Sequence, residues 1–360
     1  MQMSALSELF DATAIVAPCS FPSNRPGEIA LSGRELSVVP LTTPAGRGLR
    51  RKIGLVWWLF RNFRTLLREA LKADAAHTPI PGDIGTIGML MALSLGKPLF
   101  VRHCGDFSRR ATAAEFFWRW FMETFGGGRN VMLATGAANE PPSKKNPSIS
   151  WIFSTSLAGR EMEAYSRAQR SLSAGRKRKL IIVCRQEKGK GAETVIDALP
   201  LLLGDFPALE LDVVGDGSAL PELKRLANGL GLNGHVIFHG GVNHDSVMKL
   251  LQQADLFLFP TKSEGFPKVV VEAMACGLPV ISSKVSALPW IVGDCGFLLE
   301  ENTPAALAAA ARECLKDQDR YRAMSERARL AAQEYSLERW QDAIGQHLSR
   351  AWGPTRNART

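Results

Sequence analysis

The fold of this chain is decided by residues 263–280, which read SEGFPKVVVEAMACGLPV. Pro267 fits the first position of a helix, because the N–H that proline lacks would have no partner there. Gly277 fits the position just past the last turn, where φ is positive, and Pro279 prevents the helix from continuing. The β-branched run Val269–Val271 favours a strand, but a strand would leave both end signals unexplained. The pattern therefore predicts a loop, a helix of about ten residues and a following buried strand.

Two carboxylates flank the expected start of this helix. Glu264 lies in the loop, and Glu272 lies eight residues further on, in the helix. The first N–H groups of a helix carry positive partial charge, so those of Lys268 and Val269 favour a phosphate. A carboxylate accepts hydrogen bonds from adjacent hydroxyls, so the whole arrangement suits a nucleotide-sugar. The alternative is that Glu264 is an ordinary loop acid and that Glu272 is a solvated residue of the helix.

The same stretch resembles the donor-site signature of the retaining GT-B glycosyltransferases, family 4 in particular. The signature is E-x7-E followed by A-M-A-x-G-x-P-V, and the match runs along the whole stretch. The resemblance implies that Glu264 holds the transferred sugar and takes part in catalysis, and that Glu272 holds the ribose of the nucleotide. It also implies donor contacts from the residues between them, which are Gly265, Phe266, Lys268 and Val269.

A second motif precedes this one in the chain. Residues 180–184 form a short apolar run typical of a buried parallel strand, and Arg185 and Lys190 follow it. The segment resembles the family's strand-R-x4-K-G-helix unit, which implies that Arg185 and Lys190 bind the donor diphosphate and stabilise it as it leaves. The alternative is that both are ordinary solvated loop charges. In the family the loop after residues 236–238 lies near the base, so Val242 is a candidate base contact.

Strands and helices alternate between the two motifs, which predicts an α/β fold with a doubly wound parallel sheet. A chain of 360 residues is long enough for two domains with separate cores. The resemblance implies the GT-B arrangement, in which two Rossmann-like domains face a cleft. We expect an N-terminal acceptor-side domain over residues 1–155, a linker over 156–178, a nucleotide-sugar-binding domain over 179–335, and a C-terminal helix over 336–360 that crosses back to the first domain.

The N-terminal half resembles the family less closely. The family begins with a strand and a glycine-rich loop, whereas this sequence begins with what reads as the following helix. We therefore expect that the first strand is missing through a truncated or misassigned start. The family also places a histidine at the end of the strand that corresponds to residues 98–104. Cys104 takes that place, and His103 is one step away, on the other face of the strand. His103 and Asp106 are candidate catalytic residues near the transferred sugar.

The cysteines indicate a reducing compartment and no metal centre. All six are scattered, without C-x-x-C spacing, which predicts reduced thiols in a cytoplasmic protein. The D-x-D sequence at residues 317–319 has the form used by metal-dependent glycosyltransferases of another fold, but it lies between two expected helices, away from the motifs. We therefore expect no metal, and no cofactor beside the nucleotide-diphospho-sugar donor. No apolar run approaches the roughly 18 residues that span a bilayer.

Most of the net charge of +9 is concentrated in residues 47–72. Bulky apolar residues, including two adjacent tryptophans, are interleaved there with Glu69 and with the basic residues Arg47, Arg50, Arg51, Lys52, Arg61, Arg64, Arg68 and Lys72. A basic helix with aromatic side chains on one side suits an anionic membrane surface, which the aromatic stretch 116–121 would extend. The alternative is that the apolar side chains face the core and the arginines form a solvated rim. Nucleic acid is disfavoured, because no nucleic-acid motif is present.

Together these features predict an enzyme that transfers a hexosyl group from a nucleotide-diphospho-sugar to an acceptor hydroxyl, with retention and without metal. The expected product is a polysaccharide, lipopolysaccharide or glycolipid, and the expected location is the cytoplasm, peripherally on the inner face of the membrane. Two alternatives stay open. One is a truncated or inactive relative that binds nucleotide-sugar without turnover, and the other is a nucleotide-sugar epimerase of the same fold. The sequence does not specify the base, the sugar, the acceptor or the oligomeric state.

Overall fold

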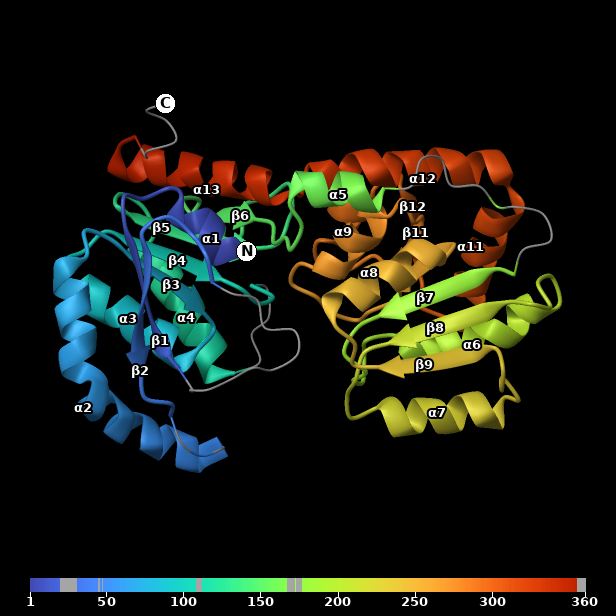
Figure 1. The fold of residues 1–360 in the computed structure, drawn as a ribbon, viewed down its shortest axis with the longest axis horizontal. Helices are drawn as coiled ribbons and strands as arrows, with labels where there is room; N and C mark the ends of the chain where they lie inside the picture. The colour runs from blue at the N-terminus through green and yellow to red at the C-terminus, as the bar shows by residue number, and fades with distance from the viewer. Residues whose placement is uncertain are drawn as a thin grey trace. The chain divides into compact units, whose positions relative to one another are not determined.

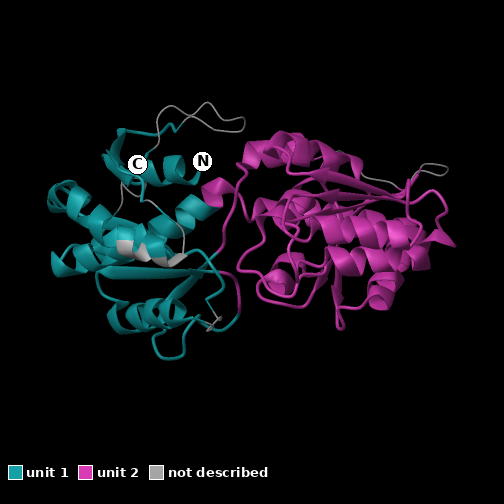
Figure 2. Cartoon of the chain, turned by 90° about the horizontal axis from the view of Figure 1, so that it is seen from below, with its two compact units in different colours: residues 1–135, 139–152, 340–360 teal, residues 136–138, 153–339 magenta. Residues whose placement is uncertain are grey.

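The computed structural model describes residues 1–19, 31–44, 46, 48–107, 112–166, 172 and 177–354. The chain forms two compact units (Figures 1 and 2). Unit 1 contains residues 1–135, 139–152 and 340–360, and unit 2 contains residues 136–138 and 153–339. Both units are built from parallel strands connected by helices.

Over its described residues, unit 2 forms a six-stranded parallel sheet in the order β12-β11-β10-β7-β8-β9 (Figure 1). Helices α6, α7 and α11 pack on one face, and α5, α8, α9 and α10 pack on the other. The predicted doubly wound α/β sheet is thus confirmed. The elements are α5 (Gly159–Tyr165), β7 (Lys179–Val183), α6 (Ala192–Leu203), β8 (Glu210–Val214), α7 (Leu220–Gly229), β9 (Val236–Gly240), α8 (His244–Gln253), β10 (Leu256–Phe259), α9 (Lys268–Ala275), β11 (Val280–Ser283), α10 (Leu288–Val292), β12 (Gly296–Leu299), α11 (Pro304–Lys316) and α12 (Gln318–Gln333).

The segment expected as a linker is partly integrated into unit 2. Helix α5 lies within it and packs on α9 and α12, and Met162 of α5 is fully buried in the core of this unit. Because the side chain of Met162 packs α5 against the helices that cover the sheet, the described residues 156–166 form part of unit 2. Within the rest of the expected linker, residues 167–171 and 173–176 lie outside the described residues.

In the described part of unit 1, four strands form a parallel sheet in the order β3-β4-β5-β6, and β1 pairs with β2 in a separate two-stranded parallel sheet. The N-terminal strands are therefore not hydrogen-bonded to the main sheet. The elements are α1 (Gln2–Ser7), β1 (Thr13–Pro18), β2 (Leu36–Leu41), α2 (Gly48–Lys72), β3 (Ala76–Ile80), α3 (Asp83–Ser94), β4 (Leu99–His103), α4 (Ala113–Phe125), β5 (Asn130–Thr135), β6 (Ser150–Ile152) and the main part of α13 (Leu337–Trp352).

The C-terminal helix α13 packs in unit 1 from Trp340 onward. The Trp340 side chain is fully buried, and the guanidinium of Arg102 in β4 lies over its ring, 5.1 Å from the centroid. At the other end, Trp352 donates from Nε1 to the carbonyl oxygen of Arg129 at 2.7 Å. Two tryptophans, one buried and one hydrogen-bonded, therefore fix this helix along unit 1.

Helix α2 has a buried face and an aromatic outer face. Trp58 and Leu66 enter a small core with Leu41 of β2. On the outer face, Trp57 and Phe60 are each 74% exposed. The expected burial of apolar side chains therefore holds for Trp58 and Leu66 but not for Trp57 and Phe60, because the adjacent tryptophans point in different directions. None of the described helices is both long and apolar enough to span a membrane.

Candidate functional site

The two sequence motifs meet where the sheet of unit 2 reverses its strand order. Strand β7 pairs with β8 on one side and with β10 on the other, so the loops that follow β7 and β10 leave the same edge of the sheet. In doubly wound sheets, ligands bind at such a switch point, outside the carboxyl ends of the strands. The loop after β7 carries Arg185 and Lys190, and the loop after β10 carries Glu264.

Gly191 allows these two loops to approach closely. Its φ is +92°, in the left-handed region that favours glycine. A Cβ at this position would lie 2.4 Å from the carbonyl oxygen of Pro260 and 2.7 Å from its carbonyl carbon, which is well inside van der Waals contact. The glycine thus lets the backbone after β7 touch the backbone after β10, and it places Lys190 beside the second motif.

Lys190 and Glu264 form an ion pair at this point. The Nζ atom of Lys190 lies 2.5 Å from Glu264 Oε1 and 3.3 Å from the carbonyl oxygen of Ser263. Both side chains are only about one-fifth exposed, at 20% and 21%. Arg185 is not brought into this pair. It is 75% exposed, and its Nη1 lies 3.6 Å from Glu187 of its own loop.

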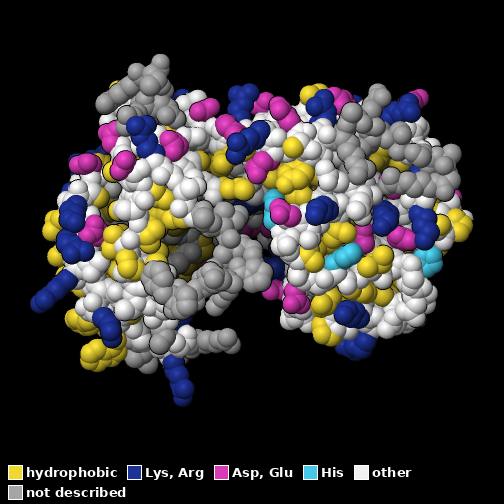
Figure 3. Space-filling model, in the orientation of Figure 1, with side chains coloured by type: hydrophobic (Ala, Val, Ile, Leu, Met, Phe, Trp, Pro, Cys, Tyr) yellow, Lys and Arg dark blue, Asp and Glu magenta, His cyan; other side chains and the backbone are white. Residues whose placement is uncertain are grey.

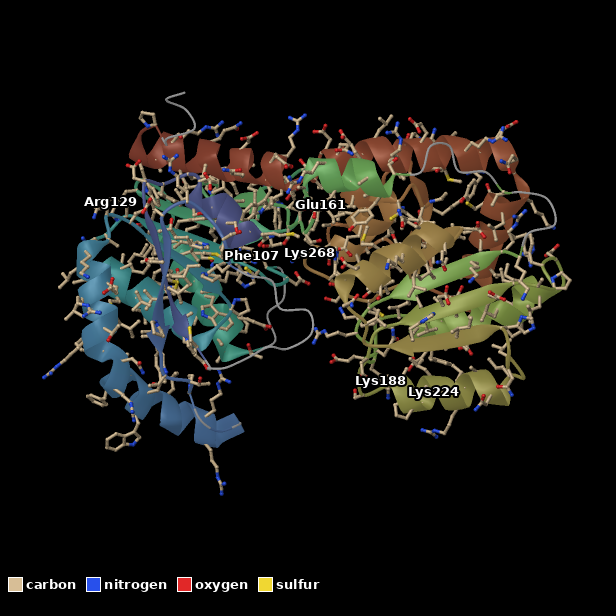
Figure 4. All side chains as sticks on the ribbon, in the orientation of Figure 1. Phe107, Arg129, Glu161, Lys188, Lys224 and Lys268 are labelled. Atoms are coloured by element: carbon tan, nitrogen blue, oxygen red, sulfur yellow. The ribbon has the colours of Figure 1, made fainter. Side chains whose placement is uncertain are left out.

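Helix α9 begins one residue later than the sequence predicted. Pro267 is the N-cap, with an extended ψ of 93°, so its placement as the first helical residue was wrong. The backbone N–H of Val270 donates to Pro267 O at 3.0 Å, so the N–H groups of Lys268 and Val269 come before this bond, at the positive end of the helix. The Lys268 side chain is exposed (Figure 4).

Glu272 is buried, so its description as a solvated helix residue was wrong. Its Oε1 accepts a hydrogen bond from Ser156 Oγ at 2.5 Å and lies 3.2 Å from His244 Nε2. The hydrogen bond to Glu272 raises the pKa of His244 above its ordinary value, against the effect of burial. Neither Ser156 nor His244 was predicted from the sequence. The one available signal was that His244 follows Val242 by two residues in the loop expected near the base.

The remaining residues expected to contact the donor differ in exposure. Gly265 is half-buried, and Phe266 is buried, with its ring 6.2 Å from that of Phe153. Val242 is 37% exposed and directly precedes Asn243, which caps α8 by accepting from Ser246 N at 2.9 Å. Val242 is therefore available to a ligand, whereas Phe266 supports the loop from within the core.

The two catalytic candidates of the N-terminal half belong to unit 1. His103 ends β4 and Asp106 lies in the loop after it. His103 is buried, its Nδ1 lies 3.2 Å from Gly105 O, and its ring meets Phe107 edge-on at 5.4 Å. Burial lowers the pKa of His103, so the imidazole is neutral at physiological pH. Cys104, the residue directly after β4, is exposed.

The D-x-D sequence serves as a helix cap. Asp317 is the N-cap of α12, and its carboxylate accepts from Arg320 N at 2.9 Å. Within the described ranges, no group of three or more His, Cys, Asp or Glu side chains is arranged to hold a metal ion.

One family model matches a region within unit 2. Residues 166–331 match the family model described as "Glycosyl transferases group 1". N-acetyl-alpha-D-glucosaminyl L-malate synthase from Bacillus anthracis is 34% identical over 157 residues, which are 43% of this chain and 40% of that protein. A GDP-mannose-dependent alpha-(1-6)-phosphatidylinositol monomannoside mannosyltransferase from Mycolicibacterium smegmatis is 31% identical over 172 residues, 45% of this chain and 44% of that protein. The matched region thus spans less than half the length of either curated relative.

A solved structure matches both units. The crystal structure of Anabaena HepE in complex with UDP and glucose has a TM-score of 0.69 and 19% sequence identity, and it covers 88% of this chain and 86% of that protein. This likeness, with the parallel sheets of both units, confirms the predicted GT-B fold class of two Rossmann-like domains. The family match supports a glycosyltransferase of group 1.

Proposed function

We propose that this protein is a retaining, metal-independent glycosyltransferase of family 4 type, which transfers a sugar from a nucleotide-diphospho-sugar to an acceptor hydroxyl. The observation that carries the proposal is the Lys190–Glu264 pair at the switch point of the unit 2 sheet. A cation and a carboxylate meet there from two neighbouring strands. The group 1 family match extends over the same unit.

Each residue of the site has a role in this proposal. Arg185 and Lys190 bind the diphosphate, together with the N–H groups at the start of α9. Glu264 accepts hydrogen bonds from the transferred sugar, and Glu272 accepts them from the ribose. Val242 contacts the base. Catalysis comes from positive groups placed where negative charge develops on the leaving diphosphate, and of the two cationic side chains Lys190 is already held there by Glu264.

The remaining candidates come from both units. Gly265 and the backbone of Phe266 contact the donor from the loop before α9. His103 and Asp106 of unit 1 act near the transferred sugar and the acceptor. Because the neutral imidazole of His103 carries one donor and one acceptor nitrogen, it is suited to hydrogen bonding with sugar hydroxyls.

Donor binding is tested by thermal shift with UDP, GDP, ADP and their common sugar conjugates. A ligand present at about 100 times its Kd stabilises the folded state by about 2.7 kcal/mol, so one base is expected to raise the unfolding midpoint by several degrees. Glu272→Ala should remove most of this shift. If no nucleotide raises the midpoint of the wild-type protein, the proposed donor site is wrong.

Product analysis separates this function from its alternatives. Transfer with retention is expected to give a new glycosidic bond with the anomeric configuration of the donor, which NMR coupling constants report. Release of a free epimerised sugar would support the epimerase. Donor binding without turnover, tested across lipid-linked and soluble acceptors, would support the inactive relative.

We further propose that the acceptor is lipid-linked and that α2 binds the cytoplasmic face of an anionic membrane. The Mycolicibacterium relative is named for transfer to a phosphatidylinositol mannoside. On α2, Trp57 and Phe60 are exposed, and exposed Arg61 and Arg64 follow them four residues later. Residues four apart share a face of a helix, so each aromatic ring lies beside an arginine. Hydrophobic and basic side chains accordingly lie close together along unit 1 in Figure 3. Arg47 and the side chain of Lys52 lie outside the described residues.

The double variant Trp57→Ser/Phe60→Ser is expected to bind vesicles containing anionic phosphatidylglycerol at least about tenfold more weakly. Burial of one aromatic side chain contributes about 1.5–3 kcal/mol, and about 1.4 kcal/mol corresponds to a factor of ten. Flotation with fluorescent vesicles measures the binding. Trp290→Ser, at a 43% exposed tryptophan of unit 2, is the matched control. Equal flotation of the double variant and the wild type would rule out this surface.

A further inference from the structure

The carboxylate of Glu272 is held by residues from two other parts of unit 2. Ser156, in the loop before α5, donates to Oε1 at 2.5 Å. His244, the first residue of α8, places Nε2 3.2 Å from the same oxygen. The Glu272 side chain is 9% exposed, whereas that of His244 is 40% exposed. One oxygen of a buried carboxylate is thus supplied with two donors.

The other oxygen, Oε2, is left for a ligand. No donor from the described part of the chain reaches it. A carboxylate oxygen offers two acceptor positions, and both positions of Oε1 are taken. The two donors therefore fix the rotation of the carboxylate and present Oε2.

We propose that Ser156 and His244 are positioning residues that hold Glu272 for the ribose, and that ionisation of His244 sets how tightly the donor nucleotide binds. This inference rests on the proposed function, because it assigns a nucleotide ribose to Glu272.

The surroundings of His244 favour the charged imidazolium. The hydrogen bond to Glu272 is the largest influence and raises the pKa, burial lowers it, and the charges of Glu272, Asp245 and Glu161 raise it further. These acids come from α9, from α8 itself and from α5. Strand β7, against which α8 also packs, contributes the apolar side chains of Ile181 and Val183 to this face. The charges with the largest effect on His244 are therefore acidic.

The direction of the pH effect follows from the two states of the ring. The imidazolium always carries a proton on Nε2, whereas the neutral ring carries it there in only one of its two tautomers. A positive charge beside the site also attracts the anionic diphosphate. The bound donor thus favours protonated His244, so affinity is highest below the pKa of His244 and falls as the pH rises through it. We expect Kd to increase by about 3–10-fold between about pH 6 and pH 9.

Isothermal titration with UDP-glucose and GDP-mannose over this range tests the proposal. Nucleotide-sugars are used because their diphosphate, unlike that of a free nucleoside diphosphate, does not titrate there. His244→Gln should give a Kd that is independent of pH and close to the wild-type value at high pH. Ser156→Ala should weaken binding at every pH but leave the dependence of Kd on pH unchanged. His239→Gln is the control, because it changes a different histidine, the one paired with Asp212 at 2.7 Å. It should also leave the dependence of Kd on pH unchanged.

The possible failures are distinguishable. The role of His244 is overturned if the wild-type Kd does not depend on pH, or if the pH dependence of Kd is the same in His244→Gln as in the wild type. The proposed function stands in either case. An unchanged affinity in Ser156→Ala overturns the role of Ser156. If the wild-type protein binds no nucleotide-sugar at any pH, the proposed function fails, and this inference fails with it.

Discussion

Replacing Lys190 by alanine is expected to lower the rate of sugar transfer by about 10²–10³-fold, the usual cost of removing one preorganised group that stabilises developing charge. The Nζ atom is held at the switch point by Glu264 and by the carbonyl oxygen of Ser263, so it is already in place before the donor arrives. Its loss removes positive charge where the diphosphate leaves, and it also leaves Glu264 without its cation. We expect kcat to fall more than the affinity for the donor, because the charge on the leaving group is larger in the transition state.

Single-turnover kinetics with saturating donor measures this effect separately from binding. Lys188→Ala is the matched control, since Lys188 is an exposed lysine of the same loop (Figure 4), and its rate should stay within about twofold, as for most surface substitutions.

Arg185→Ala is expected to lower the rate of transfer about as much as Lys190→Ala, because the exposed guanidinium is proposed to close on the diphosphate when the donor binds. A near-normal rate in Lys190→Ala or in Arg185→Ala would show that the replaced residue does not take part in catalysis.

The local elements of unit 2 could be predicted because their signals lie within a few residues of one another. Gly277 does adopt a positive φ, 70°, just past α9, and the apolar run before Arg185 is β7. The exact start of α9 could not be predicted, because it depends on the ψ angle of Pro267, and proline restricts only φ. The pairing of the strands could not be predicted from the local sequence either, because paired strands such as β7 and β10 are far apart in the chain.

In the candidate site, residues within sequence motifs could likewise be predicted, whereas residues brought together only by folding could not. Arg185, Lys190, Glu264 and Glu272 stand in motifs of fixed spacing, so the sequence pointed to them. Ser156 lies 116 residues from Glu272 in the chain, and only folding brings the two together. A motif therefore indicates candidate ligand contacts more readily than the residues proposed to position them. The same limit applies on α2, where the sequence could not tell that Trp58 is buried while Trp57 is exposed.

Replacing Trp340 by alanine is expected to destabilise unit 1 by about 3–5 kcal/mol, the range for removing a large buried aromatic side chain. Trp340 is among the largest fully buried side chains, and it packs under the guanidinium of Arg102. Arg102 is itself buried. Its Nη1 donates to Gln2 Oε1 at 2.8 Å, while its Nε has no hydrogen-bond partner. The substitution therefore leaves a cavity and also removes the ring that faces a buried positive charge.

Scanning calorimetry and guanidinium titration measure the loss of stability. Trp120→Ala is the matched control, because Trp120 lies in the same unit and is 54% exposed, so its loss should cost much less. Trp340→Phe should recover a large part of the stability, since phenylalanine refills much of the cavity and keeps an aromatic face toward Arg102. A cost below about 1 kcal/mol for Trp340→Ala, within the range of ordinary substitutions, would mean that the site collapses around the gap. In that case the docking of α13 would depend mainly on the contacts of Trp352 at its far end.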